Sequence, residues 1–66
     1  MIKIEELNKY DLGKFVRYDS QFNPGYGKIK SWNEHCIFVV FQCGDDWDKY
    51  RDYTGQSVSP LDLTFF

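Results

Sequence analysis

The sequence predicts one small all-β domain built from five short strands. Residues 36–41 form a continuous apolar run, largely β-branched or aromatic, as expected of a strand buried on both sides. Residues 14–18 and 27–32 alternate in the way that a half-buried strand requires. Turn-forming residues separate these runs, and a chain of 66 residues has room for a single domain, 1–66.

The remaining elements follow from local signals. Residues 1–13 are expected to form a short strand or a helical turn, and then a tight turn that ends at Gly13. A loop at 19–26 contains Pro24 and Gly25 in the order that a β-turn favours. A 3-10 turn at 59–62 should precede the last strand, because proline suits the first position of a helical turn. We expect strands at 14–18, 27–32, 36–41, 56–58 and 63–66.

The composition indicates how so short a chain can fold. Aromatic residues make up 20% of the sequence, and each buries a large apolar area with few rotatable bonds. No metal or disulfide is therefore needed to explain its stability. The expected core is Val16, Ile29, Ile37, Val39, Phe41, Leu61 and Leu63.

Residues 42–55 interrupt the pattern of strands. Gly44 ends the apolar run, and an acidic segment rich in tyrosine and tryptophan follows. Either Asp45 or Asp46 can cap a helical turn, since both aspartates lie where the first free backbone N–H groups would be. We expect one helical or irregular insertion here, ending at Gly55.

Short motifs resemble known small barrels. Residues 13–18 and 59–63 resemble the corresponding segments of SH3-like barrels, and the hairpin around 27–30 is similar to those of Tudor and KOW domains. This resemblance implies a five-stranded SH3-like barrel. Residues 47–63 also resemble small uncharacterised proteins of phages and prophages, which implies a phage accessory protein. The Ala-Leu-Tyr-Asp-Tyr signature of peptide-binding SH3 domains is missing, so proline-rich ligands are not expected.

No catalytic or metal-binding constellation is recognisable, and we predict neither an enzyme nor a cofactor. His35 and Cys36 are adjacent in sequence, and neighbours on a strand point to opposite faces, so they cannot form a catalytic pair there. We expect a turn histidine and a core cysteine. An EF-hand loop starting at Asp46 would need glycine at Arg51 and glutamate at Ser57. The carboxylates therefore do not match a calcium loop.

The acidic segment is the preferred candidate for a partner-binding surface. Tryptophan and tyrosine dominate protein interfaces, and aspartates around them would steer a basic protein. The competing hypothesis is that the rings of this segment fold back and plug one end of the barrel. The candidate residues are Asp45, Asp46, Trp47, Asp48, Tyr50, Asp52 and Tyr53.

The alternative function is binding of single-stranded nucleic acid. Interleaved cations and rings on strands can hold phosphates and stack on bases. Against this, the net charge is −2, and a few cations neutralise few phosphates. The rings expected to contribute, near the first loop, are those of Tyr18, Phe22 and Tyr26. The main candidates are Arg17, Lys28, Lys30 and Trp32, with the aromatic Trp32 expected beside the two lysines.

The expected location is the cytoplasm, of the host cell if a phage encodes the chain. No secretory leader is recognisable at the start, and the longest apolar run is far too short to cross a bilayer. Cys36 and Cys43 should then stay reduced. The most economical function is a non-catalytic module that binds another protein.

Overall fold

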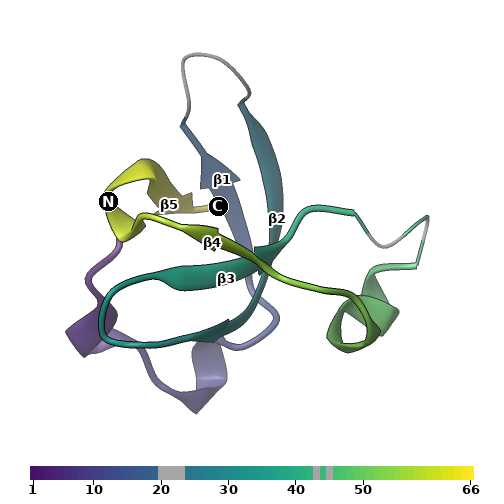
Figure 1. Ribbon diagram of the computed structural model, residues 1–66, viewed down its shortest axis with the longest axis horizontal. Coiled ribbons are helices and arrows are strands. Elements are labelled where there is room, and N and C mark those ends of the chain that lie inside the picture. The colour runs from purple at the N-terminus through teal and green to yellow at the C-terminus, as the bar shows by residue number, and fades with distance from the viewer. Residues whose placement is uncertain (20–23, 43, 45) are drawn as a thin grey trace.

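The computed structural model describes residues 1–19, 24–42, 44 and 46–66. In this part of the chain, five strands form one antiparallel sheet in the order β4-β3-β2-β1-β5 (Figure 1). The strands are β1 (Phe15–Tyr18), β2 (Gly25–Trp32), β3 (Ile37–Val40), β4 (Gln56–Val58) and β5 (Leu63–Phe65). The 3-10 turns of the described residues are η1 (Ile4–Glu6), η2 (Lys9–Asp11), η3 (Trp47–Asp52) and η4 (Pro60–Asp62).

The sheet is a curled meander whose last strand returns to pair with the first. Consecutive strands from β1 to β4 are neighbours, and β5 lies along the free side of β1. Within the described residues no ladder joins β4 to β5, so these two strands are the edges of the sheet. Val58 of β4 and Leu63 of β5 nevertheless reach the same buried cluster. The structure confirms the all-β class, the helical insertion as η3, and the 3-10 turn before the last strand as η4.

An inner cluster of aliphatic side chains fills the concave side of the sheet. The expected core residues Val16, Ile29, Ile37, Val39 and Leu63 all have 0% exposure, which confirms them. The inner cluster consists of Ile2, Val16, Ile29, Ile37, Val39, Val58 and Leu63, and Ile4, Leu7, Tyr18, Trp32 and Phe41 pack against it.

Two expected core residues differ from this arrangement. Phe41 is only half-buried, although it packs against the inner cluster as expected. The expectation that Leu61 belongs to the core is wrong, since Leu61 is 68% exposed. Leu61 belongs to the 3-10 turn η4, so the period-two alternation of β5 does not extend back to it.

A β-bulge in β2 changes which face Trp32 occupies. The register shifts between Ile29 and Ser31, which pair with successive residues of β3, so Lys30 is the additional residue. An extra residue reverses the facing of everything beyond it. Trp32 consequently pairs with Ile37 and packs against the inner cluster. The expectation that Trp32 shares a face with the two lysines of β2 is therefore wrong.

Gly27 allows β2 and β3 to approach closely. A Cβ atom at Gly27 would lie 2.4 Å from the carbonyl oxygen of Val40 and 2.8 Å from Cγ1 of Val39. The first of these neighbours is backbone, which cannot move aside cheaply. Glycine is thus required where the two strands approach this closely.

The N-terminal segment is tied to the sheet by turns and polar contacts. Residues 1–13 contain two 3-10 turns, η1 and η2. Of the two structures expected for this segment, a short strand or a helical turn, the helical turn is confirmed. The N–H of Ile2 donates to the carbonyl of Pro60 at 2.9 Å. Asn8 and Asp11 form a reciprocal capping box around η2. The ammonium of Lys14 donates to Asp11 at 2.9 Å, and this hydrogen bond, followed by that from the Asn8 N–H, lowers the pKa of Asp11.

Candidate functional site

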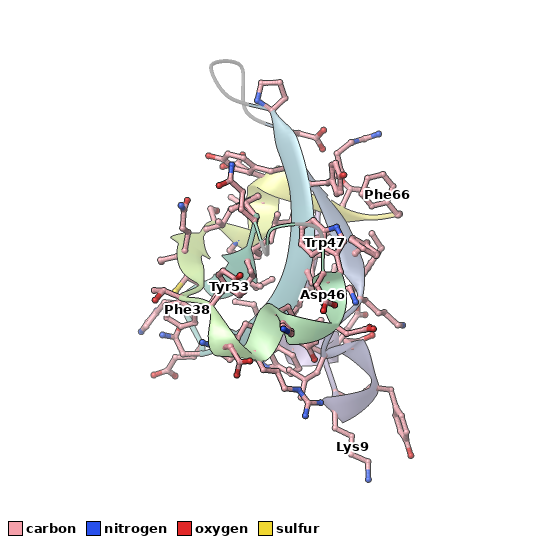
Figure 2. The ribbon with its side chains drawn as sticks, turned by 90° about the vertical axis from the view of Figure 1, so that its right-hand side faces the viewer. Lys9, Phe38, Asp46, Trp47, Tyr53 and Phe66 are labelled. Atoms are coloured by element: carbon pink, nitrogen blue, oxygen red, sulfur yellow. The ribbon has the colours of Figure 1, made fainter. Side chains whose placement is uncertain are left out.

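Four aromatic side chains meet on the outer side of the sheet, and we call this set (Phe15, Tyr26, Trp47 and Phe66) the aromatic face. The ring centroids of Phe15 and Trp47 lie 5.2 Å apart, and those of Phe15 and Tyr26 lie 6.1 Å apart. Tyr26 also contacts Trp47 at 5.8 Å and Phe66 at 5.9 Å. Figure 2 shows Trp47 and Phe66 on the same side of the molecule. The four rings thus form one connected surface.

The aromatic face remains largely open to solvent. The exposed fractions are 37% for Phe15, 51% for Tyr26 and 75% for Phe66, whereas Trp47 is half-buried. Scattered apolar side chains on a surface are ordinary, but a connected group of large rings indicates an interaction site. These residues come from β1, β2, the start of η3 and the residue after β5. Segments distant in sequence therefore build this surface together.

Cations border the aromatic face, and two of the three are already paired with carboxylates. Lys14 contacts Asp11 at 2.9 Å, and Arg17 contacts Asp19 at 2.8 Å. The Lys28 ammonium lies 5.0 Å from the centroid of the Phe15 ring. Among the described residues, no carboxylate lies within ion-pair distance of Lys28. One unpaired cation thus stands directly beside the rings.

Asp19 accepts hydrogen bonds from two side chains. Besides its pair with Arg17, it accepts a hydrogen bond from the hydroxyl of Thr64 at 3.2 Å. The contact with Arg17 is the main cause of a lowered pKa for Asp19. Arg17 is therefore paired with Asp19, the residue that follows β1.

Tyr50 is the buried ring of the acidic segment, whereas Trp47 is half-buried and Tyr53 is exposed. Asp46 caps η3, its carboxylate accepting from the N–H of Asp48 at 3.1 Å. Tyr50 is 8% exposed and packs on Val40, with Trp47 beside it. The Tyr50 hydroxyl accepts from the Arg51 guanidinium at 3.3 Å. Tyr50 therefore covers the outer face of the sheet at β3, which differs from the expected plug at an end of the barrel.

The other members of this segment divide between two places. Trp47 joins the aromatic face, whereas Tyr53 is 41% exposed and lines a pocket elsewhere. Asp48 and Asp52 are exposed to solvent. Asp45 lies outside the described residues. The residues of the expected partner-binding set therefore do not form one surface. Only Asp46 and Trp47, at the start of η3, lie next to each other beside the aromatic face.

The residues expected to bind nucleic acid are not brought together. Trp32 lies against the inner cluster, on the opposite side of the sheet from the aromatic face. The ammonium of Lys30 donates to the carbonyl of Tyr53, just beyond η3. Lys30 thereby ties the acidic segment to β2. Of this set, Lys28 lies beside the exposed Phe15 ring and Arg17 lies opposite Tyr26, where it is paired with Asp19. Tyr18 faces the pocket described below, and Phe22 lies outside the described residues.

Sequence reasoning missed Phe15, Phe66 and Lys14 as members or neighbours of an exposed surface. The alternation of β1 already placed Phe15 and Arg17 together, away from the core. Phe66 had no such signal, because only the pairing of β5 with β1 brings it to Tyr26.

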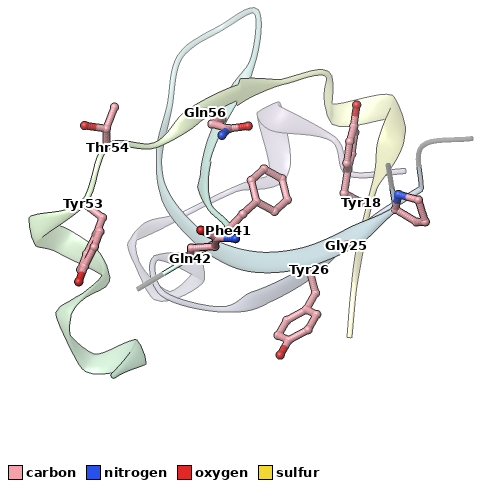
Figure 3. Close-up of a pocket in the computed structure, with 9 residues that line it drawn as sticks. Tyr18, Gly25, Tyr26, Phe41, Gln42, Tyr53, Thr54 and Gln56 are labelled. Carbon is pink, nitrogen blue, oxygen red and sulfur yellow. The ribbon is translucent and has the colours of Figure 1, made fainter. Parts of the chain in front are cut away.

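A pocket of about 700 Å³ opens at the end of the sheet near the β1–β2 hairpin. The rings of Tyr18 and Phe41, with centroids 5.8 Å apart, point into the same space, whereas Tyr26 points away from it (Figure 3). The described lining residues are Tyr18, Pro24, Gly25, Tyr26, Phe41, Gln42, Tyr53, Thr54 and Gln56. None of these described residues carries a charge.

Residues with reactive side chains do not converge in the described structure. No group of three or more His, Cys, Asp or Glu side chains there is arranged to hold a metal ion. Cys36 is a half-buried free thiol, and His35 is exposed with its Nε2 3.7 Å from Glu34. Cys43 lies outside the described residues.

Comparison of the chain with protein-family models, with curated proteins and with solved structures gives no match. In the described residues, no helix is long and apolar enough to cross a membrane. The case for function therefore depends on the surfaces of this molecule alone.

Proposed function

We propose that this chain is a non-catalytic module that binds another protein through the aromatic face. The observation that supports the proposal is the connected contact of Phe15, Tyr26, Trp47 and Phe66, with up to 75% of a side chain left exposed. Large rings at the centre of an interface supply most of the energy of protein binding.

The charges around the aromatic face favour a protein partner over a polyanion. Arg17 and Lys14 are neutralised by their own aspartates, which leaves Lys28. Asp46 and Asp48 lie at the start of η3, beside Trp47. Carboxylates next to anchoring rings speed the approach of a partner with basic residues at its rim. The partner that best fits is a protein with an apolar patch bordered by lysine or arginine.

The broader context belongs to the same proposal. We assign the chain to the SH3-like barrels, supported by a meander whose last strand returns to the first after a 3-10 turn. The resemblance of residues 47–63 to phage proteins suggests an accessory role in an infected cell. A cytoplasmic location fits the free thiol of Cys36.

Paired alanine substitutions test the aromatic face. The chain is immobilised, exposed to bacterial lysate, and the captured proteins are identified and then purified for calorimetry. Tyr26→Ala with Phe66→Ala should weaken binding by about 2 kcal/mol or more, roughly 30-fold in Kd. Tyr10→Ala is the matched control, because Tyr10 and Phe66 are both 75% exposed and Tyr10 lies on η2. Equal binding by the double variant and the control would falsify the proposal.

Binding of single-stranded nucleic acid is a second candidate, with a specific observation in its favour. Lys28, which has no carboxylate within ion-pair distance among the described residues, lies 5.0 Å from the centroid of the exposed Phe15 ring. A labelled oligonucleotide should then bind at low salt and lose affinity steeply as salt rises. Lys28→Glu should abolish this binding at an unchanged melting temperature. Absence of binding to both DNA and RNA at low salt removes this candidate.

A further inference from the structure

We propose that the free edge of β4 and the pocket beside it bind an extended, uncharged peptide segment. The segment adds a strand to the sheet along Gln56–Val58 and places one apolar side chain in the pocket, against the contacting rings of Tyr18 and Phe41. Among the described residues this site shares only Tyr26 with the aromatic face, and the Tyr26 ring points away from the pocket (Figure 3). Its occupant need not be the same protein.

The edge of β4 offers unpaired backbone groups. β4 pairs with β3 through Ile37↔Val58, Phe38↔Ser57 and Val39↔Gln56. In the described part of the chain no strand lies on its other side, so about half of its N–H and C=O groups face outward. The strand contains no lysine, no proline and no charge, so its short length, three residues, is the one usual means of keeping an edge from pairing that it has.

The opposite edge of the sheet is different. On β5, the hydroxyl of Thr64 accepts from the amino group of Met1 at 3.4 Å and donates to Asp19 at 3.2 Å. A charged amino group and a carboxylate thus stand beside β5. Charges beside an edge strand disfavour added strands, and β4 carries no charge among the described residues.

The pocket continues directly from the β4 edge. Gln56, the first residue of β4, lines the pocket together with Thr54 just before it. A strand running along β4 toward its start would therefore arrive at the pocket. The pocket volume, about 700 Å³, suits a large side chain with its flanking backbone. Proteins that bind a peptide by strand addition use the same two features: hydrogen bonds to the edge strand give affinity, and a side-chain pocket gives specificity.

The lining determines the chemistry of the occupant. The described lining residues carry no charge, so a lysine or glutamate side chain entering the pocket would lose water without gaining a partner. The rings of Tyr18 and Phe41 provide apolar walls. The amides of Gln42 and Gln56 each offer donors and an acceptor, which match the backbone of a peptide. The occupant is therefore a β-prone segment with Phe, Leu, Ile or Tyr at its central position.

Blocked peptides of about eight residues test this assignment. Each alternates threonine and valine around one central position, occupied by Phe, Leu, Lys or Glu. Titrations are followed by NMR through the backbone N–H signals of β4 and the side-chain NH₂ signals of Gln42 and Gln56. The Phe and Leu peptides should bind saturably, the Lys and Glu peptides at least about tenfold more weakly. The Phe peptide methylated at alternate backbone nitrogens should lose binding, since it keeps the side chain and lacks the donors.

Two matched variants locate the bound peptide. Ser57→Lys places a charge on the exposed edge of β4 and should weaken the Phe peptide at least about tenfold. Ser31→Lys makes the same change at an exposed position of β2 and should leave affinity unchanged. Phe66→Ala should also leave it unchanged, so failure here is separate from failure of the aromatic face. Absence of saturable binding by both apolar peptides, or binding that tolerates Ser57→Lys or backbone methylation, overturns the proposal.

Discussion

The two sides of the sheet differ in composition and in exposure. On β3, Val39 points into the inner cluster and Val40 points outward beneath Tyr50. The inner cluster is wholly aliphatic and shut off from water. The outer side is covered by aromatic rings that remain partly exposed. One sheet thus carries a buried aliphatic cluster on one side and a partly exposed aromatic surface on the other.

The largest effect is expected from Val39→Asp, which tests whether the inner side of the sheet is the buried one. The change places an unpaired carboxylate at a position with 0% exposure. Burial of an unpaired charge costs several kcal/mol, about as much as the whole stability of a small domain. The variant should lack a cooperative thermal transition by circular dichroism. Phe66→Asp, on the aromatic face, should melt within a few degrees of wild type, and a normal melt for Val39→Asp contradicts the assignment of the two sides.

A smaller effect is expected where η3 meets the outer side. Tyr50→Ala removes a ring that is 8% exposed and should lower the free energy of unfolding by about 3 kcal/mol, measured in urea. Tyr50→Phe removes only the hydrogen bond with Arg51 and should cost about 1 kcal/mol or less. If Tyr50→Ala is as mild as Tyr50→Phe, then η3 is not held by this ring.

The smallest effect concerns pH and the turn at Asp11, which lies away from both sides. Because the pKa of Asp11 is lowered in the folded state, chiefly by the hydrogen bond from Lys14, the ionised carboxylate favours folding. This contribution is complete above the unfolded pKa, about 3.9, and is lost as pH falls through the lowered folded value. The difference in urea midpoint between wild type and Asp11→Asn should therefore shrink below about pH 4.

Lys14→Met is the control for the loss of stability between about pH 4 and 2. It removes the main cause of the lowered pKa of Asp11 and leaves the carboxylate in place. Its stability should fall less steeply than that of wild type between about pH 4 and 2. A difference between wild type and Asp11→Asn that stays constant from neutral to acid pH argues against the ion pair.

The strands could be predicted because their signals are local. The apolar run at 36–41 and the alternation in β1 depend only on neighbouring residues, and both are strands in the structure. Pro60 similarly marked η4. The pairs of strands then follow from short connections, apart from the return of β5 to β1.

The candidate surfaces were harder to predict because they depend on distant contacts. No pattern in β2 announces the bulge at Lys30, yet it decides the side on which Trp32 lies. Tyr26 was assigned to a loop, whereas pairing with Arg17 of β1 extends the strand to include it. The aromatic face exists only when β1, β2 and η3 are assembled, so local sequence could supply its members but not their contact.

The bulge also determines what the chain's intrinsic fluorescence can report. The sequence contains two tryptophans, and the structure assigns Trp32 to the inner cluster and Trp47 to the aromatic face. Trp32→Phe would leave emission from Trp47 alone, a signal that a ligand on the aromatic face shifts or quenches. Trp47→Phe would leave emission from Trp32, which follows opening of the core and is insensitive to that ligand. Two single-tryptophan proteins thus give separate optical readings of binding and of folding from the same chain.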